Sequence, residues 1–225
     1  MSSPTSHVVA PWRARPVSGP LFDPARLSPA TIDARWQPLV QGWRPAGPEP
    51  GFNPGWARIG WHGSFLRYDA VLAGRDFRNR ARRLNERTWE LGDICEIFLQ
   101  VSGQPLYIEL HITPENQRLQ LLWPADGLER FRSGAAPLSN FTIDHGDWVQ
   151  SAVHVAPDYW VAQALIPANV LGLPLFHPQL ALDTTVCRYD HSGRPDPVYS
   201  ATAPLTEPAY HRRQEWQRLV LEPDN

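Results

Sequence analysis

The feature that most constrains how this chain folds is the segment 94–101, whose side chains alternate between two faces. Successive side chains of a strand point to opposite faces, so Cys95, Ile97 and Leu99 share one apolar face that we expect to pack on a core. Glu96 falls on the opposite face, between two large hydrophobic side chains. A carboxylate in that position is costly to bury without a partner and is well placed to hold a polar ligand.

A second alternating segment follows a short turn at residues 102–105 that contains glycine and proline. Tyr107, Glu109 and His111 share one face of this segment, and its aliphatic side chains share the other. Two such segments joined by a short glycine-containing turn predict an antiparallel hairpin. One face of that hairpin is then apolar, and the other carries Glu96, Glu109 and His111 together.

The hairpin belongs to a longer series of motifs. Trp89 precedes Asp93-Ile94-Cys95-Glu96-Ile97-Phe98, and Tyr107-Ile108-Glu109 and Thr113-Pro114 follow the turn. This order resembles the family 9 carbohydrate-binding modules and the wider DOMON-like group, whose pattern is a tryptophan, Asp-x-x-Glu-x-Phe, a turn and Tyr-x-Glu. Segments 57–66 and 159–167 look like the family's preceding strand pair and its strand ending in Ile-Pro, so the resemblance extends over residues 57–221.

The resemblance implies an all-β fold, a single antiparallel β-sandwich of about nine or more strands, and a non-catalytic domain that grips a sugar between aromatic rings. The family's first ring matches Trp89, and counting back from the aromatic residue of the last strand puts the second on Tyr210. Its ligand-binding glutamate matches Glu96, and its ligand-binding arginine falls at His111. Glu109, on the same face, completes the candidate carbohydrate-binding residues.

The chain departs from the family pattern at three of these positions. Trp89 lies one residue farther from Asp93 than in the binding modules, Tyr210 replaces a tryptophan, and His111 replaces the arginine. The departures bear on which sugar the site would accept.

Composition divides the chain into two regions. Residues 1–30 are rich in proline, serine and arginine and predict an N-terminal arm, whereas residues 31–225 predict the β-sandwich domain. Residues 78–87 predict either a short helix or a polar loop, and 168–173 predict one helical turn ended by Gly172. The expected strands are 57–62, 65–73, 94–101, 106–113, 118–123, 148–155, 159–166, 180–189 and 218–221.

Net charge and residue usage exclude several functions. The 21 basic residues are all arginine and are balanced by 23 acidic ones, so nothing indicates a nucleic-acid partner. Without lysine, the chain has no lysine nucleophile, Schiff base or P-loop lysine. No run of about 18 apolar residues predicts a membrane span. The N-terminus has no apolar signal region, so we expect a cytoplasmic protein, or an exported one if the start is misassigned.

The chain has two cysteines, Cys95 and Cys187, each in a strand-like segment. We expect two buried free thiols that behave as small hydrophobic side chains. The alternative, a disulfide, requires the two strands to be neighbours. No Cys/His spacing typical of a zinc site is present.

Other uses of the polar face remain open. Glu96 and Glu109 on one face are also what a glycosidase acid–base pair would require, and with His111 they offer metal ligands. A hydrogen-bonded histidine is the interpretation we favour for His111. A Glu96 with a purely structural role needs a cationic partner, for which Arg188 and Arg83 are candidates.

Cofactors are not expected. The family holds a structural calcium ion, which stays an alternative here although its ligands do not map cleanly onto this chain. Some DOMON-like domains bind haem through methionine or lysine, which is excluded here because the only methionine is Met1 and lysine is absent. Haem ligation by His111 or His211 is left as an alternative, as is a β-sandwich that only contacts other proteins.

Overall fold

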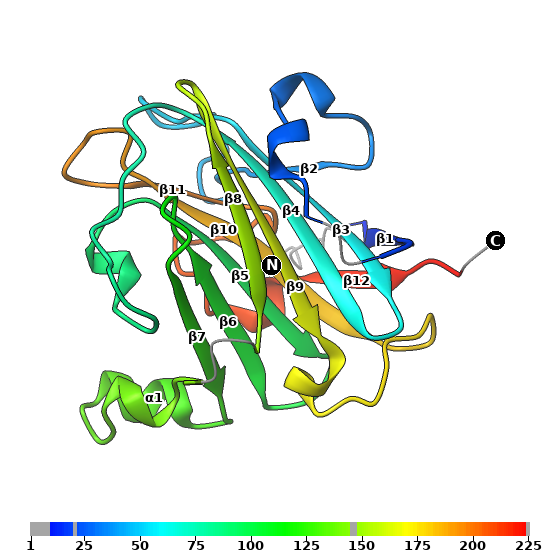
Figure 1. Ribbon diagram of the computed structural model, residues 1–225. Helices are drawn as coiled ribbons and strands as arrows, with labels where there is room; N and C mark the ends of the chain where they lie inside the picture. The colour runs from blue at the N-terminus through cyan, green and yellow to red at the C-terminus, as the bar shows by residue number, and fades with distance from the viewer. Residues whose placement is uncertain (1–9, 20–21, 145–147, 224–225) are drawn as a thin grey trace, which may run out of the picture.

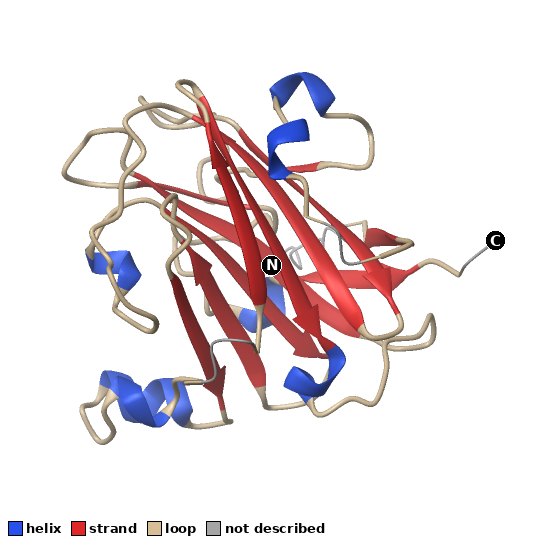
Figure 2. Ribbon diagram, viewed as in Figure 1, coloured by secondary structure: helices blue, strands red, loops and turns tan. Residues whose placement is uncertain are grey.

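The computed structural model describes residues 10–19, 22–144 and 148–223. Strands dominate it, and the helices are single short turns (Figures 1 and 2). The twelve strands are β1 Trp12–Pro16, β2 Gln37–Pro38, β3 Gly55–His62, β4 Phe65–Ala73, β5 Ile94–Val101, β6 Tyr107–Ile112, β7 Arg118–Trp123, β8 Gln150–Val155, β9 Tyr159–Pro167, β10 Leu182–Asp190, β11 Val198–Ala201 and β12 Gln217–Leu221. The helices are α1 Gly127–Arg132 and the 3-10 turns η1 Pro24–Arg26, η2 Pro29–Thr31, η3 Thr88–Glu90, η4 Leu138–Asn140, η5 Ala168–Leu171 and η6 Arg213–Glu215.

All twelve strands belong to one hydrogen-bonded series. Its order is β7-β6-β5-β10-β12-β1-β3-β4-β9-β8, with β11 beside β10 and β2 beside β3. The series curls so that the half containing β4 and β9 lies over the half containing β5 and β6 (Figure 1). Buried apolar side chains from both halves form one cluster between them. A hydrogen bond crosses this core between the Tyr68 hydroxyl and Thr184 Oγ1, which lie 3.0 Å apart.

The expected all-β class is confirmed, but the expected single antiparallel sandwich is not what the chain forms. β1 pairs in parallel with both β12 and β3, so the sheet is mixed and continuous through β1. This strand lies in the region expected to be an arm. Trp12 and Ala14 are buried while Arg13 and Arg15 are exposed, which is the alternation of a strand. β1 is only five residues long and lies beside prolines, so its alternation is too short to be recognised from the sequence.

The predicted hairpin is confirmed. β5 and β6 are antiparallel neighbours, with Glu96 opposite His111 and Phe98 opposite Glu109. Cys95, the first of the residues predicted to face the core, belongs to the apolar cluster between the two halves of the sheet, as do Ile97 and Leu99. The polar face of the hairpin therefore points to the other side of the sheet.

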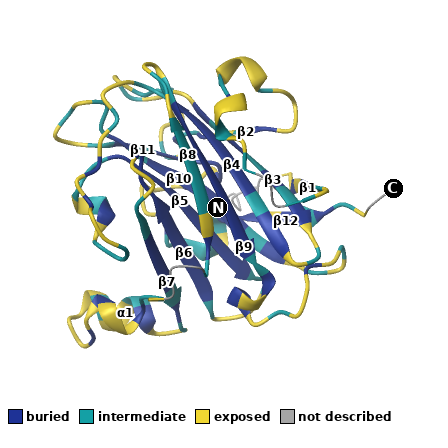
Figure 3. Cartoon of the chain, viewed as in Figure 1, coloured by how far each residue is buried: buried dark blue, intermediate teal, exposed yellow. Residues whose placement is uncertain are grey.

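That other side is covered by a second apolar cluster. Phe98, Tyr107 and Trp123 from three neighbouring strands pack there against Tyr210 and Trp216, which precede β12. α1 lies beside the end of β7 in Figure 1 and contributes residues to this side, and Figure 3 shows exposed residues on the helix. The side chains of this second cluster therefore bury much of the polar face of the hairpin.

The two cysteines are free and buried, as favoured from the sequence. β5 and β10 are neighbours, but the register sets Cys187 opposite Glu96 and Arg188 opposite Cys95. Cys95 therefore faces the core between the sheet halves, whereas Cys187 faces the outer cluster. Side chains on opposite faces of a sheet do not meet, so the alternative of a disulfide is excluded.

The two segments with predicted helical structure, 168–173 and 78–87, have different outcomes. The turn η5 ends at Gly172, whose φ of 70° is the left-handed conformation that glycine adopts at a helix end, as predicted. Residues 78–87 form the polar loop rather than the short helix. α1 and β11 were not expected. Among the described residues, no helix combines the length and the hydropathy that crossing a membrane requires.

The insertion of β1 generates a stability prediction. Trp12 is 1% exposed at the junction of the two sheet halves. We expect Trp12→Ala to lower the free energy of unfolding by about 3–5 kcal/mol, the usual cost of truncating a buried aromatic side chain. The neighbouring Arg13→Ala is the matched control and should change it by no more than about 1 kcal/mol, because its ion pair is exposed. Urea denaturation of both variants would measure this, and equal stabilities would contradict the placement of β1.

Candidate functional site

A cavity of about 320 Å³ lies on the outer face of β5 and β6. Side chains of the hairpin's polar face line it, together with residues from α1 and from the segment before β12. Every residue of the predicted carbohydrate-binding set lies on this cavity, namely Trp89, Glu96, Glu109, His111 and Tyr210. The tertiary structure therefore brings together residues that are up to 121 positions apart (210 − 89) in the sequence.

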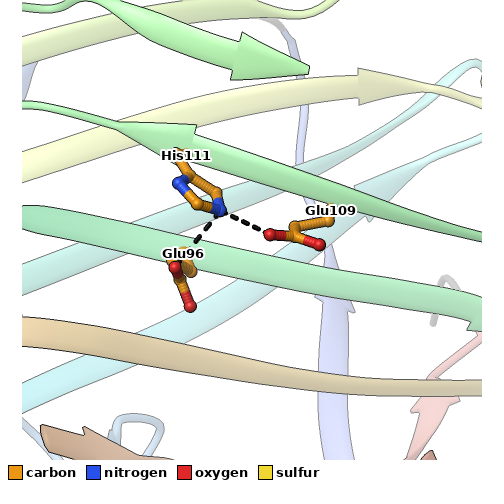
Figure 4. A group of neighbouring side chains, drawn as sticks. All are labelled: Glu96, Glu109 and His111. Carbon is orange, nitrogen blue, oxygen red and sulfur yellow. Dashed lines mark hydrogen bonds and ion pairs between the residues drawn. The ribbon is translucent and has the colours of Figure 1, made fainter. Parts of the chain in front are cut away.

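Glu96, Glu109 and His111 form the polar centre of the site. Nε2 of His111 lies 2.7 Å from Glu109 Oε1 and 3.2 Å from Glu96 Oε1 (Figure 4). The hairpin register sets this arrangement, because Glu96 stands directly opposite His111 and Glu109 is two residues away on the same strand and face. Their exposed fractions are 2%, 5% and 0%, so the whole group is buried.

Two further side chains orient this group. The Thr88 hydroxyl on η3 lies 2.8 Å from His111 Nδ1 and fixes the plane of the imidazole ring. The indole Nε1 of Trp123 on β7 donates to Glu109 Oε2 at 2.6 Å. Each oxygen of Glu109 therefore has a partner. Glu96 differs, because within the described residues its only polar contact is with His111.

His211 forms the link between this group and the covering segment. Its Nδ1 lies 2.8 Å from the Tyr107 hydroxyl, and its Nε2 lies 3.6 Å from Glu109 Oε2. The ring also packs edge-on against Phe98, with the ring centroids 5.2 Å apart. These contacts hold the segment before β12 against the floor of the cavity.

Burial and neighbouring charges set the ionisation of the group. Burial raises the pKa of Glu96 to about 8, with His111 opposing the shift and Glu109 adding to it. Burial also raises the pKa of Glu109, but the nearby His211 and the hydrogen bonds from His111 and Trp123 outweigh it, so this pKa lies below its ordinary value. Burial lowers the pKa of His111, yet the two carboxylates raise it above the ordinary range.

The two predicted rings occupy different environments. Trp89 is half-buried, lines the cavity and packs edge-on against His111 with ring centroids 5.8 Å apart. Tyr210 is buried, and its hydroxyl donates to the carbonyl of Arg188 and accepts from the backbone N–H of Ser200. Tyr210 is therefore a structural residue as well as part of the cavity lining, because its hydroxyl satisfies two buried backbone groups.

Neither arginine named as a candidate partner for a purely structural Glu96 pairs with it. Arg188 is fully buried, but it is opposite Cys95 in the register and pairs with Asp190 at 3.1 Å on the other face of the sheet. Arg83 pairs with Glu86 at 3.2 Å in the exposed loop. The charge partner is His111, which the sequence placed on the same face without indicating this pairing.

Three further residues of the site were not among the predicted set. Trp123 carried a signal, because β7 was expected and its alternation puts Leu119, Leu121 and Trp123 on one face. Nothing in the sequence indicated Thr88, and His211 was marked only as an alternative haem ligand. Both lie in irregular segments, and only packing of those segments onto the hairpin brings them to His111 and Glu109.

The role of Tyr210 can be measured. We expect Tyr210→Phe to lower the free energy of unfolding by about 1–3 kcal/mol, since it leaves a buried backbone donor without its acceptor. Tyr199→Phe is the matched control, because the half-buried Tyr199 ring packs against Tyr210 but its hydroxyl has no hydrogen bond within the described residues. Chemical denaturation compares the two, and an unchanged Tyr210→Phe would contradict a structural role for this hydroxyl.

Comparison with known proteins bears on the fold. No family model matches the sequence, and no curated protein matches it. A solved structure of a candidate carbohydrate-binding protein from Bacteroides uniformis is 16% identical, covers 83% of this chain and 86% of its own, and gives a TM-score of 0.67.

Two further solved structures are family 9 carbohydrate-binding modules from Caldicellulosiruptor kristjanssonii. The complex with glucose is 13% identical, with a TM-score of 0.58, and covers 95% of this chain and 97% of its own. The complex with cellotriose is 12% identical, with a TM-score of 0.60, and covers 95% of both chains. The chain therefore has the fold of the family 9 carbohydrate-binding modules, as the motifs predicted.

Proposed function

We propose that this chain is a non-catalytic carbohydrate-binding module that holds a sugar in the cavity over β5 and β6. The observation that carries the proposal is Glu96, a carboxylate 2% exposed that lines the cavity and, among the described residues, makes no polar contact other than the one with His111. A buried carboxylate accepts several hydrogen bonds and is costly to leave without them. Sugar hydroxyls are suitable donors.

The aromatic lining supports a sugar over other polar ligands. Trp89 forms one wall, and Tyr189 and Tyr210 lie beside Glu96 on another part of the lining. The C–H faces of a pyranose pack on such rings, and each ring contributes on the order of 1 kcal/mol beyond burial. Because the half-buried Trp89 is not tied by its indole N–H to any described residue, it has more freedom to follow a ligand than Tyr210.

The size of the cavity favours a short ligand. Its volume of about 320 Å³ lies near the lower end of the range of about 300–1,000 Å³ that ligand pockets occupy. One or two sugar rings fill such a space, whereas a long polysaccharide segment needs an open groove. Of the solved structures with this fold, the complex with glucose holds a ligand of this size, whereas cellotriose has three rings.

The arrangement of the carboxylates supports a module rather than a hydrolase. Glycoside hydrolysis uses an acid and a second carboxylate that flank the scissile bond. Here Glu109 is occupied by His111 and Trp123, and Glu96 and Glu109 both converge on the same imidazole nitrogen. A purely structural domain would have no use for a buried carboxylate that faces a cavity and, among the described residues, has only the His111 imidazole as a polar partner.

Removing the ring at the cavity wall should weaken sugar binding. We expect Trp89→Ala to weaken it at least ~5-fold, which corresponds to about 1 kcal/mol for one lost stacking ring. Isothermal titration with glucose and cello-oligosaccharides, after a broad glycan array, would measure it. Trp56→Ala is the matched control, since Trp56 is also half-buried but packs in a separate cluster beside Trp36. Wild-type protein that binds no glycan on the array would rule out the proposal.

The carboxylate can be tested separately. We expect Glu96→Gln to weaken binding several-fold above about pH 8, where Glu96 is ionised, because a hydrogen bond to a charged acceptor is roughly twice as strong as one between neutral groups. Glu90→Gln, which changes an exposed carboxylate on the same 3-10 turn as Trp89, should leave affinity unchanged. If Glu96→Gln binds the sugar as tightly as Glu90→Gln does, Glu96 does not contact the sugar.

A further inference from the structure

We propose that Glu96, Glu109 and His111 also form a binding site for a divalent transition-metal ion, of which Zn²⁺ is the best-suited probe. Each residue offers one ligand atom, and the three atoms all lie within 4.8 Å of one another. Metal binding here requires no sugar, so it can be measured whether or not the chain binds carbohydrate.

The distances within the group suit a shared ion. Zn²⁺ bonds to imidazole nitrogen and carboxylate oxygen are about 2.0–2.2 Å long and tetrahedrally arranged, so two ligand atoms around one ion are about 3.4 Å apart. Nε2 of His111 lies 2.7 Å from Glu109 Oε1 and 3.2 Å from Glu96 Oε1. Small side-chain rotations therefore suffice to seat an ion among the three atoms (Figure 4).

The surrounding hydrogen bonds hold the ligand atoms in the orientation that a metal requires. With the Nδ1 proton of His111 donated to Thr88 Oγ1, Nε2 faces the two carboxylates, and a bound ion would replace the proton that Nε2 donates to Glu109. Trp123 holds Oε2 of Glu109 and leaves Oε1 directed at the same point. A histidine whose second nitrogen donates outward, with a carboxylate fixed by a further donor, is the usual support around a protein-bound metal.

Charge favours a cation at this point. Two carboxylates converge here, and within the described residues no arginine forms an ion pair with either of them. Glu96 in particular is buried with His111 as its only polar contact. A divalent ion would give these two carboxylates a stronger charge partner than the one imidazole of His111 that they share.

The donor set selects the type of metal. One imidazole and two carboxylates suit Zn²⁺ or Mn²⁺, whereas Ca²⁺ prefers six to eight oxygen ligands, which these three residues do not supply. All three residues line the cavity, which gives an ion a path from solvent and leaves room for water at its remaining coordination positions. Such a site retains open positions for exchangeable ligands.

The experiment is a titration of untagged, EDTA-treated full-length protein with ZnCl₂ by isothermal calorimetry, with bound zinc counted by elemental analysis. We expect one Zn²⁺ per chain and no competition from equimolar CaCl₂. His111→Ala and Glu109→Gln should each weaken binding by about 10-fold or more, and Thr88→Val by about 10-fold through loss of ring orientation. His177→Ala, which removes an exposed imidazole elsewhere, should bind like wild type.

A readout on wild-type protein guards against variants that fail to fold. Zinc should shift the ¹⁵N resonance of His111 Nε2 while Nδ1 stays protonated, because only Nε2 faces the carboxylates. The proposal is overturned if wild-type protein binds no stoichiometric Zn²⁺, if folded His111→Ala binds it equally well, or if zinc leaves the His111 resonances in place. Sugar binding by the EDTA-treated protein is measured in a separate titration. A loss of zinc binding can therefore be distinguished from a loss of sugar binding.

Discussion

The antiparallel pairing of β5 with β6 is the constraint on which the rest of the structure depends. Its register places Glu96 opposite His111 and, on the reverse side of the same strands, turns Cys95, Ile97 and Leu99 into the core. A slip of one residue would exchange the two faces and put carboxylates between the sheet halves. The apolar face therefore fixes the polar one, because burial of the aliphatic side chains leaves Glu96, Glu109 and His111 only one direction in which to point.

Burying that polar group has a cost that the surroundings offset only in part. His111 pairs with both carboxylates, Trp123 donates a hydrogen bond to Glu109, and Thr88 is hydrogen-bonded to His111. Glu96 receives least, and it is also the carboxylate whose pKa burial raises most plainly. Buried polar groups with too few partners are uncommon in folded proteins and concentrate where a ligand binds. Both the sugar proposal and the metal proposal follow from this imbalance.

Two aromatic residues that line the cavity, Trp89 and Tyr210, have different roles. Trp89 stands at the wall with its ring edge toward His111, whereas Tyr210 connects the backbone of β10 and β11 through its hydroxyl. Tyr210 thus supports the cavity wall as a structural residue and presents only its ring to the interior. The covering segment before β12 is held in the same way, through the contact between His211 and Tyr107. The cavity is therefore shaped by residues that are part of the fold itself.

The sequence by itself determined the local structure of the site. The period-two alternation predicted the hairpin, the shared face of Glu96, Glu109 and His111, and the core face behind them, because side-chain direction in a strand depends only on position along it. Motif order predicted the fold. Tertiary structure alone decided that β1 joins the sheet halves in parallel, that Tyr210 is hydrogen-bonded to the backbone, and that Thr88 and His211 contact the group of Glu96, Glu109 and His111. These features depend on contacts between distant segments, and neither alternation nor spacing within one segment carries information about which other segment will pack against it.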